Sequence, residues 1–78
     1  MKRILNEIEI ELLKSYEDHS SFHGSHEGYA VILEELDELW DEVKKRNRDF
    51  KRMRKEAVQV AAMAVKFIND ICDKENER

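Results

Sequence analysis

The segment from residue 52 to 74 constrains the fold most, because as a helix it is apolar around nearly its whole circumference. A single polar line crosses it, with the spacing i, i+3, i+7, i+10 and i+14: Glu56, Gln59, Met63, Lys66 and Asp70. A helix with so little polar surface lies at the centre of a bundle or is covered by a partner chain. The polar line is either an exposed stripe, in which Lys66 and Asp70 pair at i, i+4, or one side of a functional site.

Two other segments also have helical periodicity. Residues 26–45 place their large apolar side chains, Trp40 among them, on one broad arc and acidic residues on the rest of the circumference. Residues 2–17 favour a helix, although residues 8–12 also alternate as a strand does. Residues 18–25 are polar and end in Ser25, a good N-cap. We expect Trp40 and Met63 to lie in the core.

The chain length and the three helical segments predict a single all-α domain over residues 1–78, built as a helical hairpin plus an N-terminal helix. Charged residues make up 41% of the chain and proline is absent, which favours helices over a sheet. A chain of this length buries only roughly 60% of its unfolded surface, so self-association is expected. The expected assembly is a homodimer or higher homo-oligomer that completes a four-helix-type bundle.

The sequence also favours a cytoplasmic protein without a membrane segment. Its longest apolar stretch, residues 57–71, is interrupted by polar side chains and is shorter than the ~20 residues that a span needs. Cys72 is the single cysteine, so no internal disulfide forms, and the N-terminus has no signal-peptide pattern. We expect Cys72 to be a small buried residue.

Charge is strongly segregated along the chain. Residues 44–55 carry a net charge of +7, which leaves −11 on the other residues and −4 overall. The acidic total argues against nucleic-acid binding. The basic segment is either a solvated connection, favourably placed at the C-terminal end of the preceding helix, or a clamp for phosphate groups.

Six carboxylates fall within the nine residues 34–42, beside large apolar side chains. Of these, Glu35 and Glu38 lie at the edge of the apolar arc and therefore border the core. If the helices pack antiparallel, Glu56 of the next helix joins them in a cluster of like charges. Such a cluster is stable mainly around a hard divalent cation, and Mg²⁺ prefers oxygen ligands. The alternative is a solvated acidic helix face.

The spacing of these residues carries a resemblance to a known family. Glu35-x-x-Glu38, 17 intervening residues and Glu56-x-x-Gln59 resemble the E-x-x-E … E-x-x-D signature of the MazG-like all-α nucleoside-triphosphate pyrophosphohydrolases. The resemblance extends over about residues 26–71. It implies four side chains that bind Mg²⁺, or Mn²⁺ in its place, while water attacks a nucleotide phosphate and releases a monophosphate and pyrophosphate. Glu35, Glu38 and Glu56 match the first three metal ligands.

The fourth position departs from the family pattern. Gln59 stands where the family has aspartate, and it offers a neutral carbonyl oxygen without a negative charge. The lost charge weakens Mg²⁺ binding and the stabilisation of a bound phosphate. Three interpretations follow: a working site with altered metal geometry, a changed substrate, or a relic that binds without turnover.

Roles for neighbouring residues follow from the same hypothesis. Glu34 or Glu42 takes the proton of the attacking water, and Phe22, Tyr29 and His26 are candidates for stacking on the base. Four basic side chains are candidates for holding the phosphates of the substrate: Arg52, Arg54, Lys55 and Lys66.

The sequence therefore predicts a Mg²⁺-dependent nucleoside-triphosphate pyrophosphohydrolase-like protein that acts on NTPs or dNTPs, with activity weakened by Gln59. The alternative is a non-catalytic helical module for dimerisation, protein interaction or nucleotide sensing. In that case the acidic face is only solvated, and the apolar third helix binds a second copy or another protein.

Overall fold

A computed structural model describes residues 1–74, so the last four residues of the predicted domain, 75–78, lie outside the described residues. The chain forms three α-helices, α1 (Lys2–Asp18), α2 (Ser25–Val43) and α3 (Phe50–Phe67). A six-residue π-helix, η1 (Ile68–Asp73), continues α3 without a break. No strand occurs within residues 1–74, and the stretch 8–12 is helical. The all-α prediction is confirmed.

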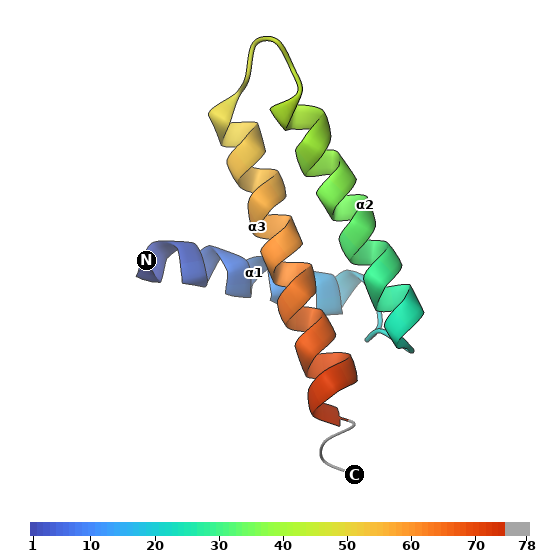
Figure 1. The fold of residues 1–78 in the computed structure, drawn as a ribbon. Coiled ribbons are helices and arrows are strands. Elements are labelled where there is room, and N and C mark those ends of the chain that lie inside the picture. The colour runs from blue at the N-terminus through green and yellow to red at the C-terminus, as the bar shows by residue number, and fades with distance from the viewer. Residues whose placement is uncertain (75–78) are drawn as a thin grey trace.

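The three helices form a hairpin crossed by a third element. α2 and α3 lie side by side and antiparallel, and α1 crosses behind them at a steep angle (Figure 1). α3 packs against both other helices. α3 therefore has a central position within one chain, which is one of the two arrangements that its apolar circumference predicted, and its polar line has two neighbouring helices to face.

The N-termini of α3 and α2 differ slightly from the predicted boundaries. Asp49 caps α3, because its carboxylate accepts hydrogen bonds from the backbone N–H groups of Lys51 (3.0 Å) and Arg52 (3.3 Å). α3 therefore begins two residues earlier than predicted. At α2 the N-cap is Gly24 and Ser25 is already helical, so the prediction of Ser25 as the cap is wrong.

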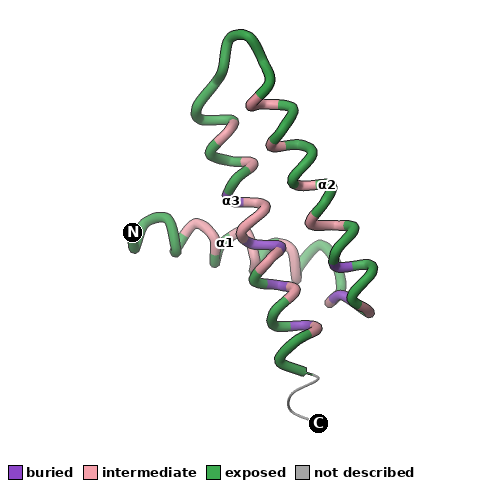
Figure 2. The backbone as a smooth tube through the Cα atoms, in the orientation of Figure 1, coloured by how far each residue is buried: buried purple, intermediate pink, exposed green. Residues whose placement is uncertain are grey.

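The core is small and lies where α1, the 19–24 loop, α2 and α3 meet (Figure 2). Phe22, Ala62 and Met63 are buried at its centre, which confirms the prediction for Met63. Gly28, the fourth residue of α2, is buried against this core. A Cβ there would lie 2.6 Å from Cδ2 of Phe67 and 3.2 Å from Cδ2 of Phe22, so glycine allows the close approach of α2.

The polar line of α3 faces inward at its C-terminal end. Lys66 is 1% exposed and Asp70 is 5% exposed, so the interpretation as an exposed stripe is wrong. Lys66 and Asp70 do not pair with each other, and each is hydrogen-bonded to other groups. The Lys66 ammonium donates to Oγ of Ser15 (2.8 Å), and the Asp70 carboxylate accepts from the Tyr16 hydroxyl and from the backbone N–H of Phe22 (2.9 Å). These bonds fasten α1 and the following loop to α3 and η1.

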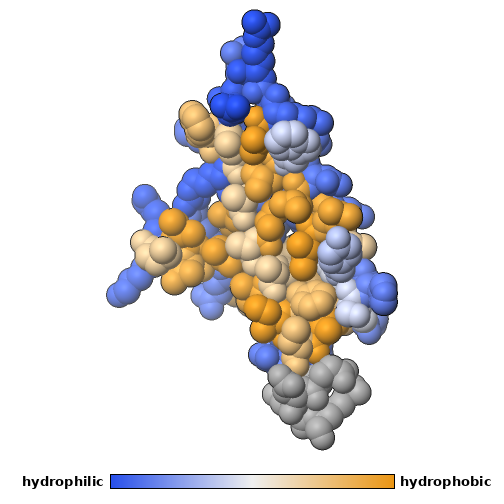
Figure 3. Space-filling view, viewed as in Figure 1, coloured by the Kyte–Doolittle hydropathy of each residue, from blue (hydrophilic) through white to orange (hydrophobic). Residues whose placement is uncertain are grey.

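A hydrophobic surface extends over α2 and α3 on the side away from α1 (Figure 3). Trp40 is 57% exposed, so the prediction that it lies in the core is wrong for a single chain. Cys72 is exposed as well, contrary to its predicted burial. The apolar arc of α2 is wider than its contact with α3. Other large apolar side chains left exposed on α2, α3 and η1 are Tyr29, Leu33, Leu36, Phe50, Val65 and Ile68.

None of the helices within residues 1–74 combines the length and the apolar character that crossing a membrane requires.

Candidate metal centre

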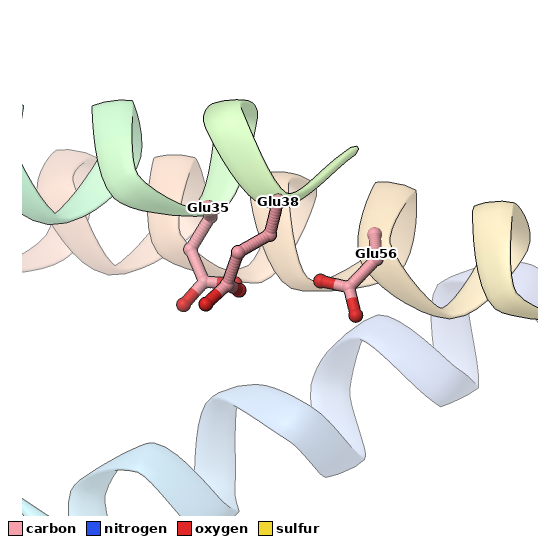
Figure 4. Close-up of side chains that lie close together, drawn as sticks. All are labelled: Glu35, Glu38 and Glu56. Atoms are coloured by element: carbon pink, nitrogen blue, oxygen red, sulfur yellow. The ribbon is translucent and has the colours of Figure 1, made fainter. Parts of the chain in front are cut away.

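Three carboxylates from two helices meet at one point. Glu35 and Glu38 project from one side of α2, and the antiparallel packing brings Glu56 of α3 beside them. One oxygen atom from each carboxylate lies within 4.8 Å of the other two. All three side chains point into the space between the hairpin and α1 (Figure 4). The predicted convergence of Glu35, Glu38 and Glu56 is confirmed.

The surroundings of Glu35 and Glu56 disfavour the ionised form of both carboxyl groups. Partial burial, as the largest single cause, and the neighbouring carboxylates of Glu38, Glu56 and Glu34 together raise the pKa of Glu35 to about 7. The pKa of Glu56 is raised by burial and by Glu38, while Lys55 opposes the rise. The surrounding chain therefore offsets only part of the repulsion, and a divalent cation between the carboxylates would remove it.

Gln59, the residue that departs from the family pattern, is turned toward α1. Its side-chain amide donates a hydrogen bond to Oε2 of Glu11, at 2.6 Å. Glu11 thus places a fourth carboxylate close to the position where the family pattern has aspartate. Sequence reasoning missed Glu11, because it is one of several glutamates that alternate with apolar residues along α1.

A cavity of about 750 Å³ adjoins the cluster, lined by α1, the 19–24 loop, α2 and α3. Glu35 belongs both to the cluster and to the wall of this cavity. Glu34 also lines it, whereas Glu42 forms an ion pair with Lys45 at 2.9 Å. Of the two predicted proton acceptors, Glu34 is therefore the one beside the cavity.

The predicted phosphate-binding residues are dispersed. Arg54 forms an ion pair with Glu7 of α1, and Arg52 lies 3.7 Å from the carboxylate of its own N-cap, Asp49. Lys55 is exposed and lies near Glu56. Lys66 is the one of the four that lines the 750 Å³ cavity.

The three candidates for stacking on the base are also dispersed. Phe22 is buried and lines the cavity. Tyr29, 65% exposed, and His26, also exposed, lie outside the lining. The structure therefore does not bring the three proposed base-stacking residues together.

Comparison of the chain with protein-family models, with curated proteins and with solved structures finds no match.

Proposed function

We propose that the protein is a Mg²⁺-dependent nucleoside-triphosphate pyrophosphohydrolase, or a nucleotide-binding relative of one. The observation that carries this proposal is the convergence of Glu35, Glu38 and Glu56 within 4.8 Å, in a cluster whose Glu35 also lines a cavity of about 750 Å³. Three carboxylates on two facing helices are hard oxygen donors of the kind that Mg²⁺ and Mn²⁺ accept. The resemblance of their spacing to the MazG-like signature supports the same assignment.

The position of each residue suggests its role in the reaction. A bound cation would neutralise the phosphates and lower the pKa of a coordinated water. Glu34 would accept the proton of the attacking water, since it lines the cavity beside Glu35. Gln59 adds no charge, and its amide nitrogen already donates to Glu11. We therefore expect weaker metal binding and slower turnover than with aspartate at this position.

A second copy of the chain is part of the proposal. Tyr29, Leu33, Leu36 and Trp40 of α2 leave an apolar face exposed, and the core of one chain is small. Pairing two hairpins through this face would complete a four-helix-type bundle and bury surface that one chain leaves in contact with water. We propose a homodimer or higher homo-oligomer, acting in the cytoplasm.

Pyrophosphate release tests the catalytic proposal. We expect the purified protein to release pyrophosphate from at least one member of a panel of NTPs and dNTPs when Mg²⁺ or Mn²⁺ is present. Glu38→Gln should abolish the release, and Glu9→Gln, at an exposed glutamate of α1, should leave it unchanged. Equal release by the wild type and Glu38→Gln would exclude the assigned role of Glu38.

A non-catalytic nucleotide sensor or interaction module is the second candidate, and the neutral Gln59 favours it. In that case, nucleotide binding would depend on the metal and on Glu38, but no nucleotide of the panel would release pyrophosphate. Equilibrium dialysis of the same panel separates the two candidates.

A further inference from the structure

Lys66 is an unusual feature of the cavity, because its side chain is almost fully buried. Its ammonium group donates a hydrogen bond to Oγ of Ser15 at 2.8 Å. It also lies 4.9 Å from the centre of the Tyr16 ring and 4.8 Å from that of the Phe22 ring. Lys66 is thus held in place from α1 and from the 19–24 loop.

Burying this ammonium is unfavourable unless an anion or several acceptors surround it. Within residues 1–74, no carboxylate lies within 4.0 Å of its Nζ atom. Asp70, one turn further along, is engaged by Tyr16 and Phe22. The two aromatic rings offset part of the cost through cation–π attraction. A lysine ammonium has three N–H donors, and Ser15 accepts one of them.

Lys66 shares a cavity with one member of the carboxylate cluster. Lys66 and Glu35 line the same cavity, together with the hydroxyl-bearing Ser15, Ser20 and Ser21. Lys66 follows Glu56 by ten residues on the polar line of α3, which is about 15 Å of helix at ~1.5 Å per residue. This is the separation of the two backbone positions, and the lysine side chain, which in a helix leans toward the N-terminus, and a cation at the cluster close part of it. The ligand between them is elongated, with a negative group at the Lys66 end.

The charge of the cavity narrows the choice of ligand. Its lining contains five carboxylate side chains and two lysines, so a free anion would be repelled. An anion that arrives with a divalent cation avoids this repulsion, since the cation binds the carboxylates. Polyphosphates combine these properties: they are extended, strongly negative and bound by Mg²⁺.

We infer that the Lys66 ammonium and the Ser15 hydroxyl hold a phosphate group of a metal-bound polyphosphate, at the end of the cavity away from the carboxylate cluster. This inference rests on the proposed function and selects Lys66 over Arg52, Arg54 and Lys55. Pyrophosphate is the simplest ligand with this chemistry, and a nucleoside triphosphate carries the same group.

Calorimetric titration of wild type and Lys66→Met tests the inference with two probes, Mn²⁺ alone and inorganic pyrophosphate with Mn²⁺ present. Methionine keeps the length of the side chain and removes its charge. We expect Mn²⁺ affinity to stay within about twofold and pyrophosphate affinity to fall by about tenfold or more, the loss typical of one hydrogen bond to a charged group. Lys14→Met is the matched control, because Lys14 lines the cavity but is exposed. We expect this variant to bind both probes like the wild type.

The outcomes separate this inference from the proposed function. If wild type and Lys66→Met bind pyrophosphate equally, the role of Lys66 is excluded and the metal centre is unaffected. If the wild type does not bind Mn²⁺, both proposals fail. Should Lys66→Met not fold, the ¹H–¹⁵N signal of the Lys66 ammonium in the wild type decides. Addition of Mg²⁺ and pyrophosphate should shift it beyond the effect of Mg²⁺ alone, and an unchanged signal would exclude the contact.

Discussion

The two ends of the polar line on α3 each carry a carboxylate near the core, but the surroundings of the two carboxylates are opposite in kind. At the C-terminal end, the Asp70 carboxylate accepts hydrogen bonds from the Tyr16 hydroxyl and the Phe22 backbone. At the N-terminal end, Glu56 faces two further carboxylates, and burial together with like charge raises its pKa. The first arrangement is complete within the chain and holds the fold together. The second is stable only when protons or a cation supply positive charge, which is what a binding site requires.

Removing the hydrogen-bonded carboxylate of Asp70 should have the largest effect on the free energy of unfolding. Asp70→Ala leaves the Phe22 N–H and the Tyr16 hydroxyl without their acceptor, and we expect it to lower the free energy of unfolding by about 3 kcal/mol. Asp73→Ala, at an exposed residue of η1, is the control and should change it by less than about 0.5 kcal/mol. Urea unfolding measures both. A loss below about 1 kcal/mol for Asp70→Ala would mean that these bonds do not hold α1 to α3.

Adding a negative charge beside the carboxylate cluster should have the next largest effect. We expect it to destabilise the metal-free protein and to strengthen the binding of metal. Gln59→Asp removes the amide that donates to Glu11 and places a second carboxylate beside it. Without metal, we expect a loss of about 1–2 kcal/mol in the free energy of unfolding. With Mn²⁺, affinity should rise because a charged ligand is added. Gln59→Asn, which shortens the side chain without adding charge, should not raise the affinity. Thermal unfolding with and without Mn²⁺ reports both effects.

The pH dependence of the metal-free protein distinguishes the cluster from an ordinary acidic surface. The pKa of Glu35 rises from 4.5 to about 7 on folding, so the folded state binds more protons than the unfolded state between these values. The contribution of Glu35 to the free energy of unfolding should therefore be largest below pH 4.5, and it should be lost as the pH rises through 7. Because Glu35 is partly solvated, we expect a change of about 1 kcal/mol. Saturating Mg²⁺ should abolish this fall, and a fall that persists unchanged in Glu35→Gln would assign it to another group.

Removing one repelling charge should have the smallest effect. In the absence of metal, Glu38→Gln should raise the free energy of unfolding by about 0.5–1 kcal/mol, because Glu35 and Glu56 then face one carboxylate fewer. Glu9→Gln removes an acidic charge outside the cluster and should be nearly neutral. A stability loss in metal-free Glu38→Gln, measured by thermal unfolding, would contradict the repulsion that we infer.

The sequence was sufficient to predict the hairpin and the convergence of Glu35, Glu38 and Glu56. The helical period fixes which side of α2 carries Glu35 and Glu38, and a short connection makes the next helix antiparallel. The cluster follows from local periodicity and one turn, which are properties of a single stretch of chain.

The features that depend on α1 could not be predicted in this way. A polar line such as Lys66 and Asp70 has the same pattern whether it faces solvent or another helix, and only the crossing of α1 decides between them. Glu11 meets Gln59 for the same reason, across 48 positions of sequence. The exposure of Trp40 has a separate cause, because an apolar arc does not reveal how much of its width a single partner helix covers.

Titration with Mn²⁺ followed by electron paramagnetic resonance tests the central claim, that the three carboxylates form a divalent cation site. At a pH above 7, where Glu35 loses its proton, we expect the wild type to remove the signal of free Mn²⁺ in a saturable manner. We expect Glu38→Gln to bind at least about tenfold more weakly, since it loses one of three charged ligands. A wild type that leaves the free Mn²⁺ signal unchanged, or binds no better than Glu38→Gln, would contradict the account.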